Sequence, residues 1–362
     1  MSKSKEKNIL CYCLNLSGGA GINMVRIASA FTLDQHKVSL AYGIKTSKCI
    51  KNISKDVNII NLKTKRSILS ILKLRAIIKD HKPDIIFTTG GTNGAIAAFS
   101  MFFSKTSAKL IIREANAPSS LIRDKPIYYR YIKRILFIYA YTKASRIIAI
   151  TKEMEKELIK LWNVVEGKLT VIYNGIDTNN SNEILYRKKN NKNINILTVG
   201  RLVLQKRQEN LILATKTLSE NYNINLTIVG DGTRKEYLQK VAKESGISDK
   251  VNFAGYTEDP SIYYRNSDIF VLSSQFEGFP NVILEALYWG LPVVSTNCPT
   301  GPEEIINHME HGYLVPVGDV KGLVEGIEFV INNEWDTNTL KSRANYFSLD
   351  KQLKKFRNLA QK

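Results

Sequence analysis

Short apolar segments alternate with longer amphipathic ones along the whole chain. The short segments are rich in β-branched residues, as buried strands are, and the longer ones repeat their apolar positions at helical spacing. The first half contains the predicted strands Asn8–Leu14, Val38–Tyr42, Val57–Ile60, Ile85–Thr88, Lys109–Ile112, Arg146–Ile150 and Leu169–Ile172. The second half contains Asn195–Val199, Asn225–Val229, Val251–Phe253, Ile269–Leu272 and Pro292–Ser295. This alternation predicts parallel sheets covered by helices on both faces.

The chain is long enough for two such domains. Its 362 residues exceed the usual size of one hydrophobic core, and a content of 44% hydrophobic residues is ordinary for a globular protein. The stretch Asn179–Lys192 is rich in Asn and Lys and has no apolar period, which is typical of a linker. We therefore predict an α/β protein with two Rossmann-like domains, residues 1–177 and 178–345.

Neither a membrane span nor a secreted protein is expected. The longest uncharged stretch, Ile85–Ser104, has 20 residues, but Thr88–Gly94 is rich in Thr and Gly, which favours a strand, a turn and a helix. The apolar run Ile9–Leu16 is too short for a signal peptide. No Cys-x-x-Cys pair occurs, so we expect reduced thiols of a cytosolic protein at Cys11, Cys13, Cys49 and Cys298.

Positive charge is concentrated in the first half of the chain. Residues 1–177 contain 30 Lys and Arg against 12 Asp and Glu, a net charge of +18, whereas the remainder carries +1. Part of this excess follows from a general bias toward Lys, Asn and Ile. The rest predicts that the first domain faces an anionic partner, for which nucleic acid, anionic lipid and a phosphorylated acceptor are the candidates.

The most informative chemical pattern is the pair Glu277 and Glu285, eight residues apart. Glu277 follows a predicted strand, and a Gly-Phe-Pro turn leads from it into a helix expected over Asn281–Gly290. The free N–H groups of a helix N-terminus can bind an anion, and a carboxylate one turn into the helix can accept hydrogen bonds from sugar hydroxyls. This arrangement suits a nucleotide-sugar diphosphate.

Spacing alone does not identify a site. Glu236 and Glu244 are also eight residues apart, but apolar residues at helical period and two interleaved lysines lie between them. That pattern is typical of a solvated surface helix, and we predict no function for it.

Several further segments stand in a fixed order around this pair. They are Tyr173–Asp177, Val199-Gly-Arg-Leu202 with Lys206, Val229-Gly-Asp-Gly232, Glu277-Gly-Phe-Pro-Asn281 with Glu285, and Cys298–Glu304. In this order they resemble the retaining glycosyltransferases of family 4, and the amino-terminal half matches more weakly. The resemblance implies the GT-B fold, in which two Rossmann-like domains face each other across a cleft. It also implies that a C-terminal helix, residues 346–362, packs back on the first domain.

The resemblance implies a donor site on the second domain. Arg201 and Lys206 would neutralise the departing nucleoside diphosphate in place of a metal, and no Asp-x-Asp metal motif occurs. We therefore expect no metal and no cofactor. Glu277 would position the donor sugar and Glu285 the ribose. The other donor-binding residues implied are Gly200, Gly230, Tyr256, Gly278, Phe279, Pro280, Asn281 and Val282.

Two loops of the first domain are candidates for the other side of the cleft. In the Gly-rich turn that precedes a predicted helix at Ile22–Phe31, Gly18 and Gly19 are candidate contacts for the donor diphosphate or the acceptor. After the strand that ends at Ile112, Glu114 is a candidate catalytic residue that would contact the acceptor hydroxyl or the donor sugar, and Asn116 would hydrogen-bond either.

Two positions depart from the pattern of the family. Several relatives use a histidine in the loop that here contains Glu114, and no histidine of this chain falls in it. Arg207 stands where family members commonly have Gly. Its side chain would either add a third phosphate contact or point to solvent.

The predicted helix Ile127–Tyr141 combines aromatic residues with cations. Arg130, Lys133 and Arg134 lie at positions i, i+3 and i+4 and therefore share one face, and Arg123 precedes the helix. Such a face can hold a pyrophosphate or lie on anionic headgroups. An amphipathic helix with a solvated basic edge is the alternative, and the sequence leaves both open.

Together these features predict a metal-independent retaining hexosyltransferase. It would move a hexosyl or N-acetylhexosaminyl unit from a nucleotide diphosphate sugar to a saccharide acceptor. The Cys298–Pro302 segment resembles that of family members that build lipid-linked surface glycans from UDP-sugars, and this resemblance implies the same substrate class and a role in cell-surface polysaccharide synthesis. We expect it in the cytoplasm, peripherally associated with the anionic inner face of the cell membrane. A sugar-nucleotide epimerase of the same fold is the alternative. A basic nucleic-acid-binding protein is less favoured, since no nucleic-acid module is recognisable.

Overall fold

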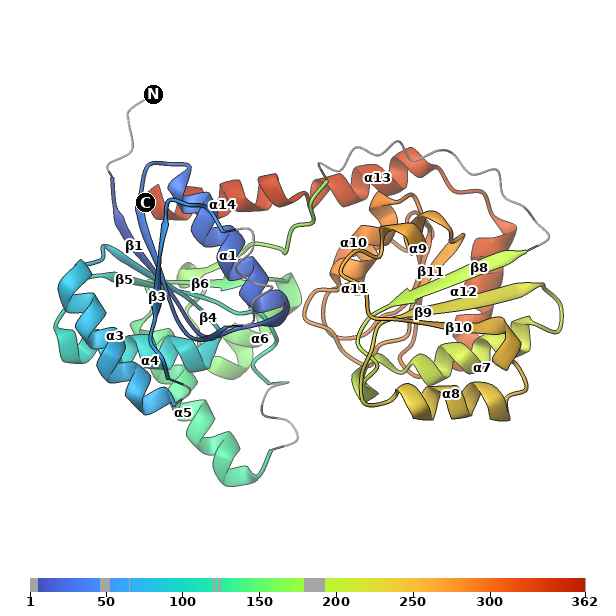
Figure 1. Ribbon diagram of the computed structural model, residues 1–362, viewed down its shortest axis with the longest axis horizontal. Coiled ribbons are helices and arrows are strands. Elements are labelled where there is room, and N and C mark those ends of the chain that lie inside the picture. Colours follow the sequence, from blue (N-terminus) through green and yellow to red (C-terminus); the bar gives the residue numbers. More distant parts are fainter. Residues whose placement is uncertain are drawn as a thin grey trace. The chain divides into compact units, whose positions relative to one another are not determined.

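The computed structural model describes residues 6–45, 53–64, 66–119, 122, 125–178 and 193–361, and it divides into two compact units (Figure 1). Unit 1 comprises Met1–Asn174 and Asp350–Lys362, and unit 2 comprises Gly175–Leu349. The predicted linker Asn179–Lys192 lies outside the described residues. The chain therefore passes between the units twice, once near Gly175 and once near Leu349.

Unit 1 is built on a parallel sheet of seven strands in the order β3-β2-β1-β4-β5-β6-β7. Its strands are β1 (Asn8–Leu16), β2 (Lys37–Lys45), β3 (Val57–Asn61), β4 (Ile85–Thr89), β5 (Lys109–Arg113), β6 (Arg146–Ala149) and β7 (Leu169–Val171). Its helices are α1 (Gly18–Thr32), α3 (Ser67–His81), α4 (Gly91–Ser104), α5 (Ile127–Lys143), α6 (Lys152–Trp162) and α14 (Leu349–Gln361).

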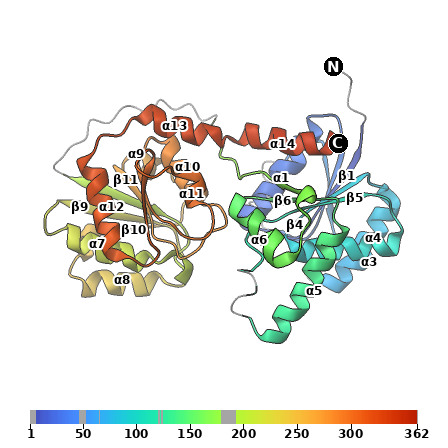
Figure 2. The ribbon, with the colours of Figure 1, turned by 180° about the vertical axis from the view of Figure 1, so that it is seen from behind.

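Helices cover both faces of this sheet. Helices α1 and α14 lie on one face, and α3, α4 and α5 lie side by side on the other (Figures 1 and 2). The Phe87 ring on β4 meets Phe31 of α1 and Phe356 of α14 edge to face, with ring centroids 5.7 and 6.0 Å apart. Arg357 of α14 donates to Asp34 through Nε at 3.0 Å. The last helix of the chain is thus a part of the core of unit 1.

Unit 2 has a parallel sheet of six strands in the order β10-β9-β8-β11-β12-β13. Its strands are β8 (Ile194–Val199), β9 (Ile224–Val229), β10 (Val251–Gly255), β11 (Ile269–Leu272), β12 (Val293–Thr296) and β13 (Gly312–Val315). Its helices are α7 (Gln208–Leu218), α8 (Lys235–Glu244), α9 (Ser261–Arg265), α10 (Asn281–Tyr288), α11 (Pro302–Ile305), α12 (Val320–Asn332) and α13 (Thr337–Tyr346).

Buried leucines of α7, α8 and α12 pack on the strands of unit 2 in one apolar core, and α10 packs against α13. Each unit is therefore a parallel sheet between helices. Burial on both faces explains why these strands are continuously apolar. The predicted fold class, two Rossmann-like domains with parallel sheets, is confirmed.

Several local predictions can be compared with the structure. The uncharged stretch Ile85–Ser104 forms β4 and α4, as predicted. No helix among the described residues is long and apolar enough to cross a bilayer. The described cysteines, Cys11, Cys13 and Cys298, are buried and form no disulfide bond with one another, and Cys49 lies outside the described residues.

Two local predictions were wrong. Helix α1 begins at Gly18 and not at Ile22, because the first helical hydrogen bond runs from the Gly21 N–H to the Ser17 backbone carbonyl at 3.2 Å. Gly18 and Gly19 therefore lie in the first helical turn. Strand β13 was not predicted, since its four residues have no clear period and are defined by pairing with β12.

Candidate functional site

The candidate donor residues of unit 2 lie on loops that follow four neighbouring strands. In the order β10, β9, β8 and β11, these strands are followed by Tyr256, Gly230, Arg201 and Glu277. All four strands are parallel, so their carboxyl ends form one edge, which is where open α/β sheets bind ligands. Segments spread over about eighty residues of sequence are thereby brought to one edge of the sheet.

Lys206 and Glu277 form an ion pair at this edge. Lys206 Nζ lies 2.6 Å from Glu277 Oε1, and the two side chains are only 13% and 9% exposed. The Ser274 hydroxyl donates to the same carboxylate oxygen at 2.6 Å. Gly200 lies beside the Lys206 side chain, with Cε 3.4 Å from where a Cβ would stand, so the strand end has room for the lysine.

The loop that begins at Glu277 is held by the segment after β12. The Glu277 N–H donates to the Pro299 carbonyl at 2.7 Å, and the Thr300 N–H donates back to the Glu277 carbonyl at 3.1 Å. The Thr300 hydroxyl also donates to the Gly278 carbonyl at 2.6 Å. The Cys298–Glu304 segment thus fixes the backbone of the glutamate loop.

The residues that follow Glu277 and Gly278 differ in burial and in their contacts. Phe279 and Pro280 are buried, and the Phe279 ring packs on Phe347 at 5.6 Å, so their side chains stabilise the loop. Helix α10 begins at Asn281, whose Oδ1 is buried and has no hydrogen-bond partner among the described residues. Val282 is half-buried one residue further into the helix.

Glu285 lies on α10, and Tyr264 of α9 orients it. The Tyr264 hydroxyl donates to Glu285 Oε2 at 2.8 Å. Burial and the adjacent carboxylate raise the pKa of Tyr264 well above its ordinary value, so the tyrosine stays a hydrogen-bond donor. The second pair of glutamates with the same spacing has different surroundings. Glu236 and Glu244 are exposed on α8, and Glu244 pairs with Lys240 at 3.6 Å, which confirms the predicted surface helix.

The two arginines near Lys206 have distinct surroundings. Arg201 is exposed, and its side chain makes no hydrogen bond or ion pair with any other residue that the structure describes. Arg207 has a left-handed backbone with φ of 48° and directs its guanidinium to Glu209 at 3.5 Å and Gln275 at 3.3 Å. The Arg207 side chain is 36% exposed, so these contacts leave the two alternatives expected for it open.

Glu114 of unit 1 is fully buried, which corrects the expected contact with a sugar. Its Oε1 accepts from the Tyr141 hydroxyl at 2.9 Å, while its Oε2 is buried with no partner among the described residues. Burial raises the pKa of Glu114 to about 7. The preceding Arg113 is also buried and contacts Asn174, and burial lowers the pKa of Arg113 to about 10.

Gly18, Gly19 and Asn116 are exposed at the carboxyl edge of the sheet of unit 1. An added Cβ on either glycine would meet no atom within 4 Å. These positions are accessible to a ligand, in contrast to Glu114. Arg123 lies outside the described residues.

The predicted basic face of α5 is divided by internal contacts. Lys133 Nζ donates to the Thr92 hydroxyl of α4 at 2.9 Å, and Arg134 donates to the Leu161 carbonyl of α6 at 3.0 Å. Burial lowers the pKa of Lys133. Arg130 is exposed on the amino-terminal half of α5, which projects beyond the rest of unit 1 (Figure 1). Of the three, only Arg130 has a side chain without a hydrogen bond or ion pair in the part of the chain that the structure describes.

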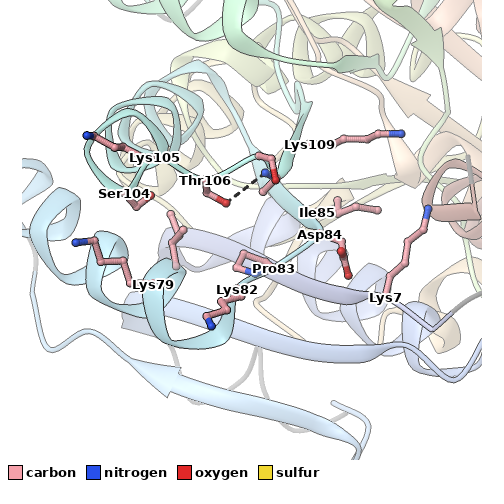
Figure 3. Close-up of a pocket in the computed structure, with 13 residues that line it drawn as sticks. Lys7, Lys79, Lys82, Pro83, Asp84, Ile85, Ser104, Lys105, Thr106 and Lys109 are labelled. Carbon is pink, nitrogen blue, oxygen red and sulfur yellow. Dashed lines mark hydrogen bonds between the residues drawn. The ribbon is translucent and has the colours of Figure 1, made fainter.

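A hollow of about 610 Å³ lies at the opposite edge of the sheet of unit 1, where β4 and β5 begin. Figure 3 shows its lysines spread around the rim, with Lys79 and Lys105 on one side and Lys7 and Lys109 on the other. Lys79 and Lys105 lie at the carboxyl ends of α3 and α4, where positive charge stabilises the helix dipole. Helix stability accounts for these two lysines without a ligand.

Family models match both halves of the chain. Residues 17–180 match the one described as Glycosyltransferase Family 4, and residues 182–347 match the one described as glycosyl transferases group 1. The chain belongs to glycosyltransferase family 4. It is therefore an enzyme that transfers sugars.

Individual relatives agree with this assignment. An uncharacterised glycosyltransferase of Haemophilus influenzae is 29% identical over 90% of this chain and 91% of its own length. The N-acetylgalactosamine-N,N'-diacetylbacillosaminyl-diphospho-undecaprenol 4-alpha-N-acetylgalactosaminyltransferase of Campylobacter jejuni is 29% identical over 67% of this chain and 66% of its own.

Solved structures identify the fold as GT-B. The lipopolysaccharide outer core galactosyltransferase WaaB matches with a TM-score of 0.80 and 21% identity, over 98% of this chain and 99% of WaaB. Anabaena HepE, solved in complex with UDP and glucose, matches with a TM-score of 0.78 and 19% identity, over 98% of this chain and 99% of HepE.

Sequence reasoning missed three residues that hold the glutamates. Ser274 stands three residues before Glu277, and Thr300 lies within the Cys298–Glu304 segment. Both are close to the motif in sequence, so the motif could have drawn attention to them. Tyr264 is distant in sequence from Glu285, and no sequence signal connects the two.

Proposed function

We propose that this glycosyltransferase transfers a hexosyl or N-acetylhexosaminyl unit from a UDP-sugar to a lipid-linked saccharide, with retention and without a metal. The observation that carries the proposal is the pairing of Lys206 with Glu277 at the ligand-binding edge of unit 2, beside the exposed Arg201. This arrangement places a cation and a hydrogen-bond acceptor for sugar hydroxyls 2.6 Å apart. Such a pair could contact the diphosphate and the sugar of one donor.

In this proposal the leaving diphosphate is stabilised by two cations. The Lys206 ammonium has three N–H donors, and one of them serves Glu277, so others remain for a phosphate oxygen. Arg201 would supply the second positive charge, and the free N–H groups at the start of α10 would add hydrogen bonds. Gly200, Gly230 and Gly278 would let the backbone approach the donor, and Tyr256 would lie near its base.

Glu277 would hold the sugar, and Glu285 would bind the ribose. Neither is assigned as a nucleophile in the proposed mechanism. The acceptor hydroxyl would attack from the face that the diphosphate leaves, and the leaving phosphate oxygen would take its proton, so that the glycosidic bond forms as the sugar–phosphate bond breaks. Retention follows from this same-face displacement.

A lipid-linked acceptor and a membrane location are supported by charge and by the names of relatives. The first 177 residues carry a net charge of +18, and the matched Campylobacter protein is named for a diphospho-undecaprenol substrate. On unit 1, Gly18, Gly19 and Asn116 are accessible for an acceptor, and Arg130 for its pyrophosphate or for anionic headgroups. The enzyme would then work at the cytoplasmic face of the membrane.

Release of nucleoside diphosphate tests the proposal. The protein is incubated with a panel of nucleotide sugars, with and without a lipid-pyrophosphate saccharide. We expect one UDP-sugar to release UDP, at a rate that rises at least tenfold when the acceptor is added. NMR of the product should show an α-linkage when the donor is α-linked. Conversion of the donor to an epimer without acceptor would favour the epimerase, and an inverted linkage would overturn the same-face mechanism.

A further inference from the structure

We propose that Ser274 is a positioning residue that orients the Glu277 carboxylate toward the donor sugar. This inference rests on the proposed function and assigns a role to a residue that the sequence motif did not single out. Ser274 lies between strand β11 and the glutamate loop and is fully buried. Its hydroxyl donates to Glu277 Oε1 at 2.6 Å, the same atom that Lys206 contacts.

The hydrogen bonds from Lys206 and Ser274 occupy one oxygen of the Glu277 carboxylate and leave the other for the donor sugar. Oε1 accepts from both Lys206 and Ser274, whereas Oε2 has no partner among the described residues and is not enclosed by them. A lysine alone could be met by either oxygen, because its flexible chain and three N–H groups impose little direction. A second donor from a fixed position removes this freedom, so Oε2 is directed outward.

Ser274 is itself held in place by the neighbouring strand. The Thr296 hydroxyl of β12 donates to the Ser274 carbonyl at 2.6 Å. The backbone of Glu277 is fixed separately by Pro299 and Thr300. The Ser274 hydroxyl therefore acts on the direction of the carboxylate and not on the position of the loop.

The test compares Ser274→Ala with Ser295→Ala in steady-state assays on the full chain. Ser295 is equally buried one strand away, but its hydroxyl donates to the Thr296 carbonyl at 3.0 Å. A hydrogen bond to a charged group is strong enough that we expect kcat of Ser274→Ala to fall about 10- to 100-fold, with the donor KM within about threefold. Ser295→Ala should keep kcat within about threefold.

A double-mutant cycle separates positioning from general damage. In a Glu277→Ala background no carboxylate remains to be oriented, so adding Ser274→Ala should change kcat by less than about threefold. Equal losses from Ser274→Ala in both backgrounds, or a kcat of Ser274→Ala that matches that of Ser295→Ala, would overturn the role.

The proposed function and the positioning role can fail separately. If wild-type protein releases nucleoside diphosphate from no donor, the proposed function is rejected. The orientation is then measured in a high-resolution crystal structure of Ser274→Ala. Rotation of the Glu277 carboxylate relative to Lys206 supports the positioning role, and an unchanged carboxylate contradicts it.

Discussion

At the scale of single residues, the exposed Arg201 and the paired Lys206 define how the leaving group would be stabilised. If these two cations replace a metal, turnover should persist in EDTA. Arg201→Ala should lower kcat by about 10². Lys206→Ala should lower kcat at least as much, because it also leaves the largely buried Glu277 carboxylate without its cation. Loss of all activity on chelation, restored by Mg²⁺ or Mn²⁺, would contradict the metal-free mechanism. Lys240→Ala on the exposed face of α8 serves as the control.

The two glutamates of the motif should differ in their kinetic effects. Glu285 is proposed to contact the ribose, which is bound alike in the ground state and the transition state, so Glu285→Gln should mainly raise the donor KM. Glu277→Gln should lower kcat more than donor affinity. Glu236→Gln and Glu244→Gln share the spacing but lie on the surface of α8, and they should change neither quantity. Similar losses in both pairs would show that the motif has been misinterpreted.

Glu114 gives the protein a predicted pH dependence of stability. Burial raises its pKa from an ordinary value near 4.5 to about 7, so the folded state binds the proton more tightly than the unfolded state. The stability that this carboxyl contributes is complete below about pH 4.5 and is lost as the pH rises through 7, by on the order of 3 kcal/mol. Urea unfolding should therefore show wild type losing stability relative to Glu114→Gln between pH 5 and pH 8. Parallel pH profiles of the two proteins would contradict this.

At the scale of elements, the two halves of helix α5 have different surroundings. Tyr128 and Tyr131 are 67% and 68% exposed beside Arg130, whereas Lys133 and Arg134 bind α4 and α6. The amino-terminal half is thus exposed, and the carboxyl-terminal half packs on neighbouring helices of unit 1.

The membrane prediction follows this division. Arg130, Tyr128 and Tyr131 are changed together to Ser, and binding to anionic liposomes is measured by co-sedimentation. We expect the affinity to fall at least fivefold, since the lost arginine alone contributes about 1 kcal/mol near the surface. Binding of wild type should fall as salt rises. Lys240→Ser in unit 2 should have no effect. Tight, salt-sensitive DNA or RNA binding without liposome association would refute the membrane role and leave the glycosyltransferase assignment intact.

At the scale of the whole molecule, the two passages of the chain between the units meet. The Leu349 N–H donates to the Ile176 carbonyl at 2.7 Å, and the Ile176 N–H donates to the Phe347 carbonyl at 3.2 Å. Gly175 permits this pairing, because an added Cβ would lie 2.5 Å from the Leu349 Cα. The backbone of one passage therefore requires a glycine in the other.

Substitution of that glycine should affect the whole chain. Gly175→Ala places a Cβ against backbone that cannot easily move, and we expect a loss of about 1–3 kcal/mol in urea unfolding. Gly167→Ala is the matched control, since a Cβ there meets nothing within 4 Å and should change stability by less than about 0.5 kcal/mol. An unchanged Gly175→Ala protein would show that the two passages can separate without cost.

The sequence by itself determined the fold class and the order of the ligand loops. Buried parallel strands need continuous apolar runs, and helices between them need an apolar stripe, so alternation of the two patterns is visible without a structure. The glutamate motif was equally visible, because Glu277, the Gly-Phe-Pro turn and the start of α10 are adjacent in the chain. Local signals were less reliable at Gly18, where glycine is compatible with both a turn and a first helical turn.

Only the tertiary structure decided which side chains meet and which are buried. Lys206, Ser274 and Thr300 converge on Glu277 because β8, β11 and β12 are neighbours in the sheet, and strand order is set by packing of the whole unit. Glu114 has the same sequence context as an accessible loop residue, yet the helices of unit 1 enclose it. Burial and pairing are sums over many distant contacts, so no short segment of the sequence contains them.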